Sequence, residues 1–200
     1  MSHMPQSRPY HHGDLRAALL AAAEHTLRER GVGSLSLREL AREVGVSHAA
    51  PGRHFKDKQA LLNDLALAGY ERLGLALDAA DDPALTIEPR LTALSRAYLG
   101  FAVDNTELLE LMYARKHDPD ASEQMAAAFE RTVGSLVQVV ADAQKRGEII
   151  AGDPEELNLV TGATLHGMAA LISGGVLTSE AALAGVDNLV HHLLHGLKPR

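Results

Sequence analysis

The sequence predicts an all-α protein of about nine helices, with an N-terminal three-helix helix-turn-helix domain and a larger C-terminal helical domain. Apolar residues recur at spacings of three and four along most of its 200 residues, as in helices with one buried face. Capping and start signals precede most of these stripes. No stretch shows the sustained alternation, rich in β-branched or aromatic residues, that is typical of strands.

The composition excludes several classes of protein. There is no cysteine, which rules out disulfides, thiolate metal ligands and cysteine nucleophiles. No apolar run reaches the roughly 18 residues that a membrane span needs, and the start lacks the apolar segment of a signal peptide. We therefore expect a cytoplasmic protein. Residues 1–12 are predicted to form a flexible arm whose first four residues read like a cloning scar.

Charge is distributed unevenly along the chain. The formal net charge is −7. Residues 1–60 hold nine Lys/Arg and six Asp/Glu, a net charge of +3, whereas residues 61–200 hold ten and twenty, a net charge of −10. A basic head attracts phosphates, and an acidic body disfavours indiscriminate binding to nucleic acid.

The first two helices have clear boundaries. A supporting helix is predicted from residue 13 to residue 30, with one apolar face. The next helix starts at Leu37, because Ser36 and Glu39 form an S-x-x-E capping box. It ends after two turns at Gly45, where a left-handed residue is expected.

A further helix is predicted over residues 47–54. Ser47 is a good N-cap, and the short turn before it matches the motif that lays a second helix in the DNA major groove. Pro51 falls in the first turn, where it is tolerated. This helix has little apolar material, so we expect its outer face to contact a partner, while Phe55 packs inward. An exposed helix pair without a partner is the alternative.

The rest of the chain shows only helical patterns. Asp57 is expected to cap a long helix over residues 58–80. Lys58, at the start of that helix, either meets a phosphate or remains a solvated cation. Start signals then predict five further helices. The first has Pro89 in its first turn, and the second begins at Asn105. The other three run from Asp118-Pro119 to Gly147, from Asp153-Pro154 to about Ser173, and from Thr178 or Ser179 to about Leu197.

Residues 46–62, VSHAAPGRHFKDKQALL, resemble the recognition helix and following helix start of the tetracycline-repressor (TetR) family of transcriptional regulators. At Gly52, family members often have a tyrosine that reaches a phosphate, and this chain lacks that side chain. The resemblance implies base contacts by His48, Ala49 and Arg53. It implies phosphate contacts by Ser36, Ser47, His54 and Lys58.

Residues 147–177 resemble the C-terminal domain named for a Trp-His-Gly (WHG) signature in the same superfamily. His166 and Gly167 match the signature, but the chain contains no tryptophan, and Gly162 lies near where it would fall. The implied organisation is an arm over residues 1–12, a DNA-binding domain over 13–57 and a ligand-binding and dimerisation domain over 58–200.

The last two predicted helices, over about 154–173 and 179–197, are candidates for the homodimer interface. Small residues such as Gly162, Ala163 and Gly167 follow one helix, and the next is strongly apolar. Two such helices from each subunit would form a four-helix bundle, the association that the family resemblance implies. Burial of both helices against the monomer's own core is the alternative.

No catalytic motif is present, so we expect neither an enzyme nor a cofactor. His191 and His195 have the i, i+4 spacing that a divalent metal can bridge, but no third ligand is evident near them, and surface or interface histidines are the expected interpretation. In the family, the effector pocket lies among the helices after the long connecting helix. The candidates here, each of which could equally be a core residue, are Tyr98, Phe101, Met112, Tyr113, His117, Met125, Phe129, His166 and Met168.

The expected function is a DNA-binding transcriptional regulator, a repressor that binds a palindromic double-stranded operator as a homodimer. A small apolar or amphipathic effector would release it. Two alternatives stay open. One is a helical small-molecule-binding protein or enzyme with a vestigial DNA-binding head, which would show no sequence-selective DNA binding. The other is a DNA-bound dimer without an effector.

Overall fold

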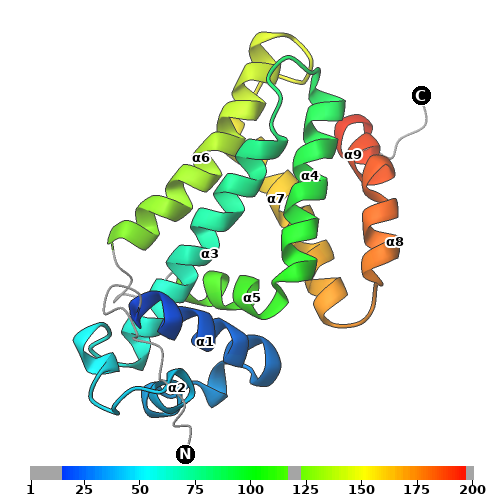
Figure 1. The fold of residues 1–200 in the computed structure, drawn as a ribbon. Coiled ribbons are helices and arrows are strands. Elements are labelled where there is room, and N and C mark those ends of the chain that lie inside the picture. Colours follow the sequence, from blue (N-terminus) through cyan, green and yellow to red (C-terminus); the bar gives the residue numbers. More distant parts are fainter. Residues whose placement is uncertain (1–14, 117–122, 197–200) are drawn as a thin grey trace, which may run out of the picture. The chain divides into compact units, whose positions relative to one another are not determined.

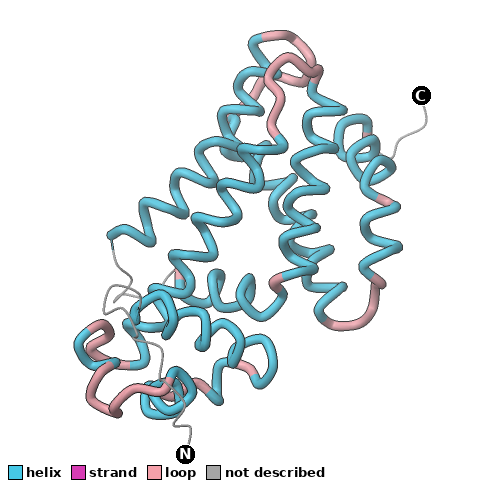
Figure 2. Tube along the Cα trace, in the orientation of Figure 1, coloured by secondary structure: helices cyan, strands magenta, loops and turns pink. Residues whose placement is uncertain are grey.

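The computed structural model describes residues 15–116 and 123–196 and confirms the all-α prediction. The described residues form nine α-helices and two short 3-10 helices, without any strand (Figures 1 and 2). The predicted helix start at Asp118-Pro119 lies outside the described residues. The chain divides into two compact units between Leu65 and Ala66, a division that falls inside helix α3 (Lys58–Ala80).

The first unit contains α1 (Leu15–Arg30), α2 (Leu37–Val44) and the first two turns of α3, with 3-10 turns at Val32–Ser34 and Pro51–Arg53. Its core side chains are almost wholly removed from solvent. Local signals place its breaks as predicted: Gly45 adopts φ +78° after α2, and Asp57 Oδ1 accepts from the Ala60 N–H at 2.8 Å to cap α3. The core consists of Leu19, Leu27, Leu40, Phe55, Leu61 and Leu65, among others.

Two predictions for this unit are wrong. Ser36 occupies the N-cap of α2 but makes no side-chain capping hydrogen bond, so the capping box does not form. The predicted helix over residues 47–54 is a turn followed by the 3-10 helix Pro51–Arg53. Pro51 has no N–H to donate into an α-helical turn, and Gly52 is a poor helix former. The backbone closes shorter bonds instead, with the N–H groups of Ala50 and Arg53 donating to the carbonyls three residues earlier.

The second unit is organised around α4 (Ile87–Asp104), which contacts α5 (Thr106–Arg115), α7 (Pro154–Ser173), α8 (Ser179–Ala184) and α9 (Val186–His195) (Figure 1). The second unit also contains residues 66–80 of α3 and helix α6 (Glu123–Lys145), which packs on α7. The predicted start of α7 is confirmed, since Asp153 accepts from the Glu155 N–H at 2.9 Å and Pro154 opens the helix. Within the described residues, no helix is both long and apolar enough to cross a membrane.

The single last helix predicted over about 179–197 is in fact two helices. It breaks at Gly185, whose N–H closes α8 on the Ala181 carbonyl at 3.0 Å. Glycine has a low helix propensity, so the chain can change direction there at small cost. After the break, Val186 and Val190 are fully buried, and α9 packs against α4. This apolar face of α9 therefore belongs to the monomer's own core.

Helices α3 and α5 lie close together at Gly69. A Cβ at this position would lie 2.5 Å from Met112 Sδ and 2.9 Å from Met112 Cγ, and Met112 is fully buried. We expect Gly69→Leu to lower the free energy of unfolding by about 1–3 kcal/mol, because overpacking displaces this contact. Gly134→Leu on α6 is the control, since a Cβ there meets nothing within 4 Å. Urea unfolding checks both variants, and equal stability of the two would contradict the prediction.

Candidate functional site

The segment from Ser47 to His54 is held on the surface of the first unit by two buried anchors. Pro51 and Phe55 are almost fully buried, and the Phe55 N–H donates to the Pro51 carbonyl at 2.9 Å. The side chains between and before these anchors face solvent. Exposed candidates for DNA contact on this segment are Ser47, His48, Ala49, Arg53 and His54.

The two other candidates for DNA contact, Ser36 and Lys58, are half-buried. The Lys58 ammonium donates to the Gly33 carbonyl at 3.4 Å, a long contact that leaves its other protons available. Nearby, the Arg16 guanidinium lies 5.9 Å from the centre of the Phe55 ring and pairs with Asp64 at 2.7 Å. Arg16 therefore braces the start of α3, whereas Arg53 projects from the surface.

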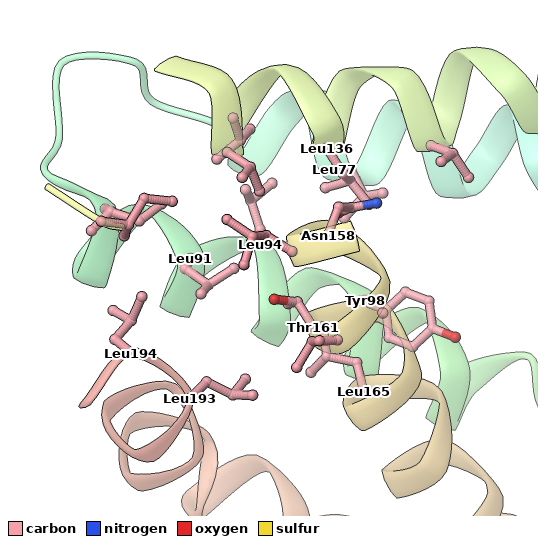
Figure 3. Close-up of a pocket in the computed structure, with 18 of the residues that line it drawn as sticks. Leu77, Leu91, Leu94, Tyr98, Leu136, Asn158, Thr161, Leu165, Leu193 and Leu194 are labelled. Carbon is pink, nitrogen blue, oxygen red and sulfur yellow. The ribbon is translucent and has the colours of Figure 1, made fainter. Parts of the chain in front are cut away.

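The second unit holds a pocket of about 830 Å³. Its walls come from α3, α4, α5, α6, α7 and α9 and from residues 148–150. Figure 3 shows leucine side chains from α3, α4, α6, α7 and α9 around it. The lining is mostly apolar, with the amide of Asn158 and the hydroxyl of Thr161 as polar groups on α7. The apolar lining includes Leu73, Leu77, Leu91, Leu94, Val133, Leu136, Leu165, Leu193 and Leu194.

A polar cluster lies beside the pocket. Tyr98 and Tyr113 line the pocket. The Tyr98 hydroxyl lies 3.1 Å from His166 Nδ1 and 3.4 Å from the Tyr113 hydroxyl. The His166 ring stacks on Tyr113 with a centroid distance of 3.8 Å. Burial lowers the pKa of His166, and the positive charge of Lys116 lowers it further. Burial likewise raises the pKa of Tyr98, so both groups are neutral near pH 7.

Among the residues that the structure describes, the carboxylates lining the pocket are Glu88 and Glu148, and no Lys or Arg lines it. Glu148 accepts from Arg146 Nε and from the Ile87 N–H, each at 2.6 Å. A hydrogen bond from His191 is the main cause that lowers the pKa of Glu88. Both carboxylates are thus ionised, and the charge of Glu148 is balanced by the Arg146 guanidinium.

The predicted effector-contact residues are placed in three ways. Tyr98, Tyr113 and Phe129 line the pocket, and His166 lies behind Tyr98. Four candidates lie outside the lining: Phe101, Met112 and Met125 are buried, and Met168 is half-buried. His117 lies outside the described residues.

Sequence reasoning missed most of the lining. Leu73, Leu77, Leu91 and Leu94 have the spacing of a buried core stripe, so the sequence alone gives no sign that they line a pocket. Asn158 was the one available signal, because an amide inside an otherwise apolar stretch of α7 needs a polar partner.

The chain matches the model described as "Bacterial regulatory proteins, tetR family" over residues 19–65, and "Tetracyclin repressor-like, C-terminal domain" over residues 91–197. It belongs to the TetR family. The TetR assignment confirms the resemblance seen in residues 46–62, whereas the WHG subfamily stays a prediction.

Individual relatives agree with this assignment. HTH-type transcriptional regulator Rv1816 of Mycobacterium tuberculosis is 27% identical over 141 residues, which are 68% of this TetR chain. The chain matches only 59% of that relative's length. A solved Rhodococcus sp. RHA1 protein of unknown function is 45% identical, with a TM-score of 0.82 over 94% of this chain and 100% of that one.

The fold also recurs at low identity. The regulator FadR from Bacillus subtilis, solved in complex with stearoyl-CoA, is 14% identical with a TM-score of 0.75. That alignment covers 91% of this TetR chain and 99% of FadR. At such identity the likeness concerns the fold alone.

Proposed function

We propose that this TetR-family protein is a homodimeric transcriptional repressor that binds a palindromic DNA operator and leaves it when a small amphipathic molecule fills the pocket. The observation that carries the proposal is the apolar pocket of about 830 Å³. This volume lies within the range of about 300–1,000 Å³ typical of ligand sites. A pocket of that size, in a chain that also carries a DNA-binding family signature, fits an effector-controlled regulator.

The DNA contacts are assigned to the exposed segment 47–54 and its neighbours. His48, Ala49 and Arg53 would face bases, and Ser36, Ser47, His54 and Lys58 would meet phosphates. Because residues 47–54 form a turn and a 3-10 helix, only a short stretch can enter the major groove from each subunit. Specificity then depends on a few side chains and on the spacing of two half-sites.

The effector is expected to be neutral or cationic, with an apolar chain. Leucine walls suit an alkyl chain, as the stearoyl-CoA of the FadR structure illustrates for a protein of the same fold. Among the described residues, the lining includes Glu88 and Glu148 and no Lys or Arg, and Arg146 balances only Glu148, so an anionic head beside Glu88 would meet like charge. Asn158 and Thr161 offer hydrogen bonds to a neutral polar head.

Selection of bound DNA from a random pool tests this function. An enriched palindrome supports the regulator, and the absence of any enriched sequence would instead favour a binding protein with a vestigial head. The enriched DNA is then titrated with decanol, decylamine, decanoate and stearoyl-CoA as probes. Release by decanol or decylamine at lower concentration than by decanoate supports the assignment of the pocket. Equal release by all probes would contradict it.

Arg53→Ala is expected to weaken binding to the selected operator by about 1–3 kcal/mol if the guanidinium reads a base. The loss should be confined to operators that carry the preferred base at one position of each half-site. Arg28→Ala is a matched control, because Arg28 is an exposed arginine of the same unit that lies near Glu24. Fluorescence anisotropy with base-substituted operators measures both. An equal loss on every sequence would show that Arg53 meets phosphate only.

Of the two last helices predicted to form the homodimer, we assign it to α7, because the apolar face of α9 is buried against α4. Most of this apolar helix faces solvent in the monomer: only Leu165 and Ala169 are buried, while Leu159, Val160 and Leu171 are exposed. Gly162, Ala163, Gly167 and Ala170 lie exposed on the same helix and would let two helices approach closely. An apolar helix that its own chain leaves uncovered is suited to pack against its symmetry mate.

A further inference from the structure

The break at Gly185 brings two histidines of α9 to the first turn of α4. His191 Nδ1 lies 3.2 Å from Glu88 Oε1, and His195 Nε2 lies 3.6 Å from Glu88 Oε2. One donor atom from each of the three residues lies within 4.8 Å of the others. Glu88 is 103 positions from His191 in the chain, so the sequence expectation that no third ligand lies near the histidines is wrong.

We propose that Glu88, His191 and His195 bind a divalent transition metal ion of the Zn²⁺ class. Imidazole nitrogen with a carboxylate oxygen is a ligand set that Zn²⁺ accepts, at bond lengths of about 2.0–2.2 Å. Tetrahedral ligands at such bond lengths are separated by about 3.3–3.5 Å. The two histidine-to-glutamate distances, each to a different oxygen of the Glu88 carboxylate, are close to this value, and rotation of the Glu88 side chain can bring one oxygen toward both histidines.

The backbone beneath the three side chains is fixed, which favours binding. Val186 and Val190 are fully buried on the inner face of α9, so the helix cannot turn its histidines away from α4 without unpacking. The histidine rings are 4.5 Å apart, one helical turn from each other. The side chains themselves remain accessible, with exposed fractions of 47% for Glu88, 51% for His191 and 34% for His195.

Three protein ligands leave one tetrahedral position open. Glu88 and His195 also line the pocket, so the proposed site adjoins the pocket wall. A metal ion here would tie α9 to α4 and offset the negative charge of Glu88. The site is independent of DNA binding and of the dimer, and it can be tested on the free protein.

Calorimetric titration of the chelator-treated full chain with Zn²⁺ tests the site. We expect His191→Ala, His195→Ala and Glu88→Gln each to weaken one Zn²⁺ site on the order of tenfold or more. His192→Ala is the matched control, because His192 is the adjacent exposed histidine of α9 and lies outside the ligand group. All four positions are solvent-exposed, so the variants should fold.

Two further measurements sharpen the result. Co²⁺ should give visible d–d absorption that His191→Ala abolishes and His192→Ala keeps. Zn²⁺ should raise the Tm of the wild type more than that of the three ligand variants, because binding to the folded state alone stabilises it. The proposal is overturned if the three variants bind Zn²⁺ as tightly as the wild type, or if His192→Ala loses as much affinity as they do. The three side chains would then be a hydrogen-bonded surface cluster without a metal.

Discussion

Asp81→Ala is expected to lower the free energy of unfolding by about 3 kcal/mol, because it removes the carboxylate that pairs with the buried guanidinium of Arg90. Arg90 lies on α4 with its side chain only 3% exposed, and it makes two hydrogen bonds to Asp81, at 2.6 and 2.9 Å. Removal of one partner of a buried pair leaves a charge that the interior cannot solvate. The expected loss lies at the lower end of such cases, since Asp81 itself is 25% exposed.

The companion variant Arg90→Met should behave differently. Methionine matches much of the volume of arginine and brings no charge, and a partly exposed Asp81 can be solvated by water. Within the part of the chain that the structure describes, Arg90 Nη1 has no hydrogen-bond partner, so its removal also relieves an unsatisfied donor. We expect Arg90→Met to change stability by less than about 1.5 kcal/mol.

The Arg96–Asp187 pair is the control for charge removal alone. Its atoms lie 2.8 Å apart, but its side chains are 43% and 69% exposed, so Asp187→Ala should cost less than about 1 kcal/mol. Urea unfolding followed by circular dichroism measures all three variants. Equal losses in Asp81→Ala and Asp187→Ala would show that burial of Arg90 does not carry the effect.

Short-range signals in the sequence placed most helix boundaries. Gly45, Asp57 and the Asp153-Pro154 pair act through their own backbone neighbours, and each ends or begins a helix where expected. These effects depend on a few adjacent residues, so they can be read without a fold. The all-α class follows from the sum of many such signals.

Local signals failed where two of them compete. Ser47 favours a helix start, but Pro51 and Gly52 restrict the backbone after it to a 3-10 turn. The stretch after Ser179 has a continuous helical pattern, yet the helix is interrupted at Gly185. We attribute the break to the free energy gained when Val186 is buried and α9 packs on α4. Such packing between distant helices cannot be predicted from the pattern of one sequence.

The pocket and the Glu88–histidine cluster are formed by residues far apart in the chain, and the sequence did not predict which of these residues meet. Leucines that line a pocket and leucines that fill a core share one spacing, so Leu91 and Leu94 could not be distinguished from core residues. Glu88 joins His191 and His195 only because α9 packs on α4. By contrast, five of the seven predicted DNA-contact residues lie within the segment 47–54, so they could be named from a family resemblance without long-range contacts, and their role stays a prediction.

Leu159→Glu is expected to convert the proposed dimer into a monomer. Leu159 is 68% exposed in the monomer, so the substitution should leave the subunit folded. In a two-fold interface each subunit contributes the same residue, so one substitution places two carboxylates in the apolar contact. A loss of about 2–4 kcal/mol for a central interface leucine corresponds to a roughly 30- to 1,000-fold weaker dimer.

Leu75→Glu is the matched control, because Leu75 on α3 is also 68% exposed and lies outside α7. Light scattering at micromolar concentration should report a dimer for the wild type and for Leu75→Glu, and a monomer for Leu159→Glu. The operator affinity should fall together with the dimer, since a palindrome needs both half-sites occupied at once. A wild-type monomer would contradict the dimer itself, whereas a dimeric Leu159→Glu would show that the two subunits meet through a surface other than α7.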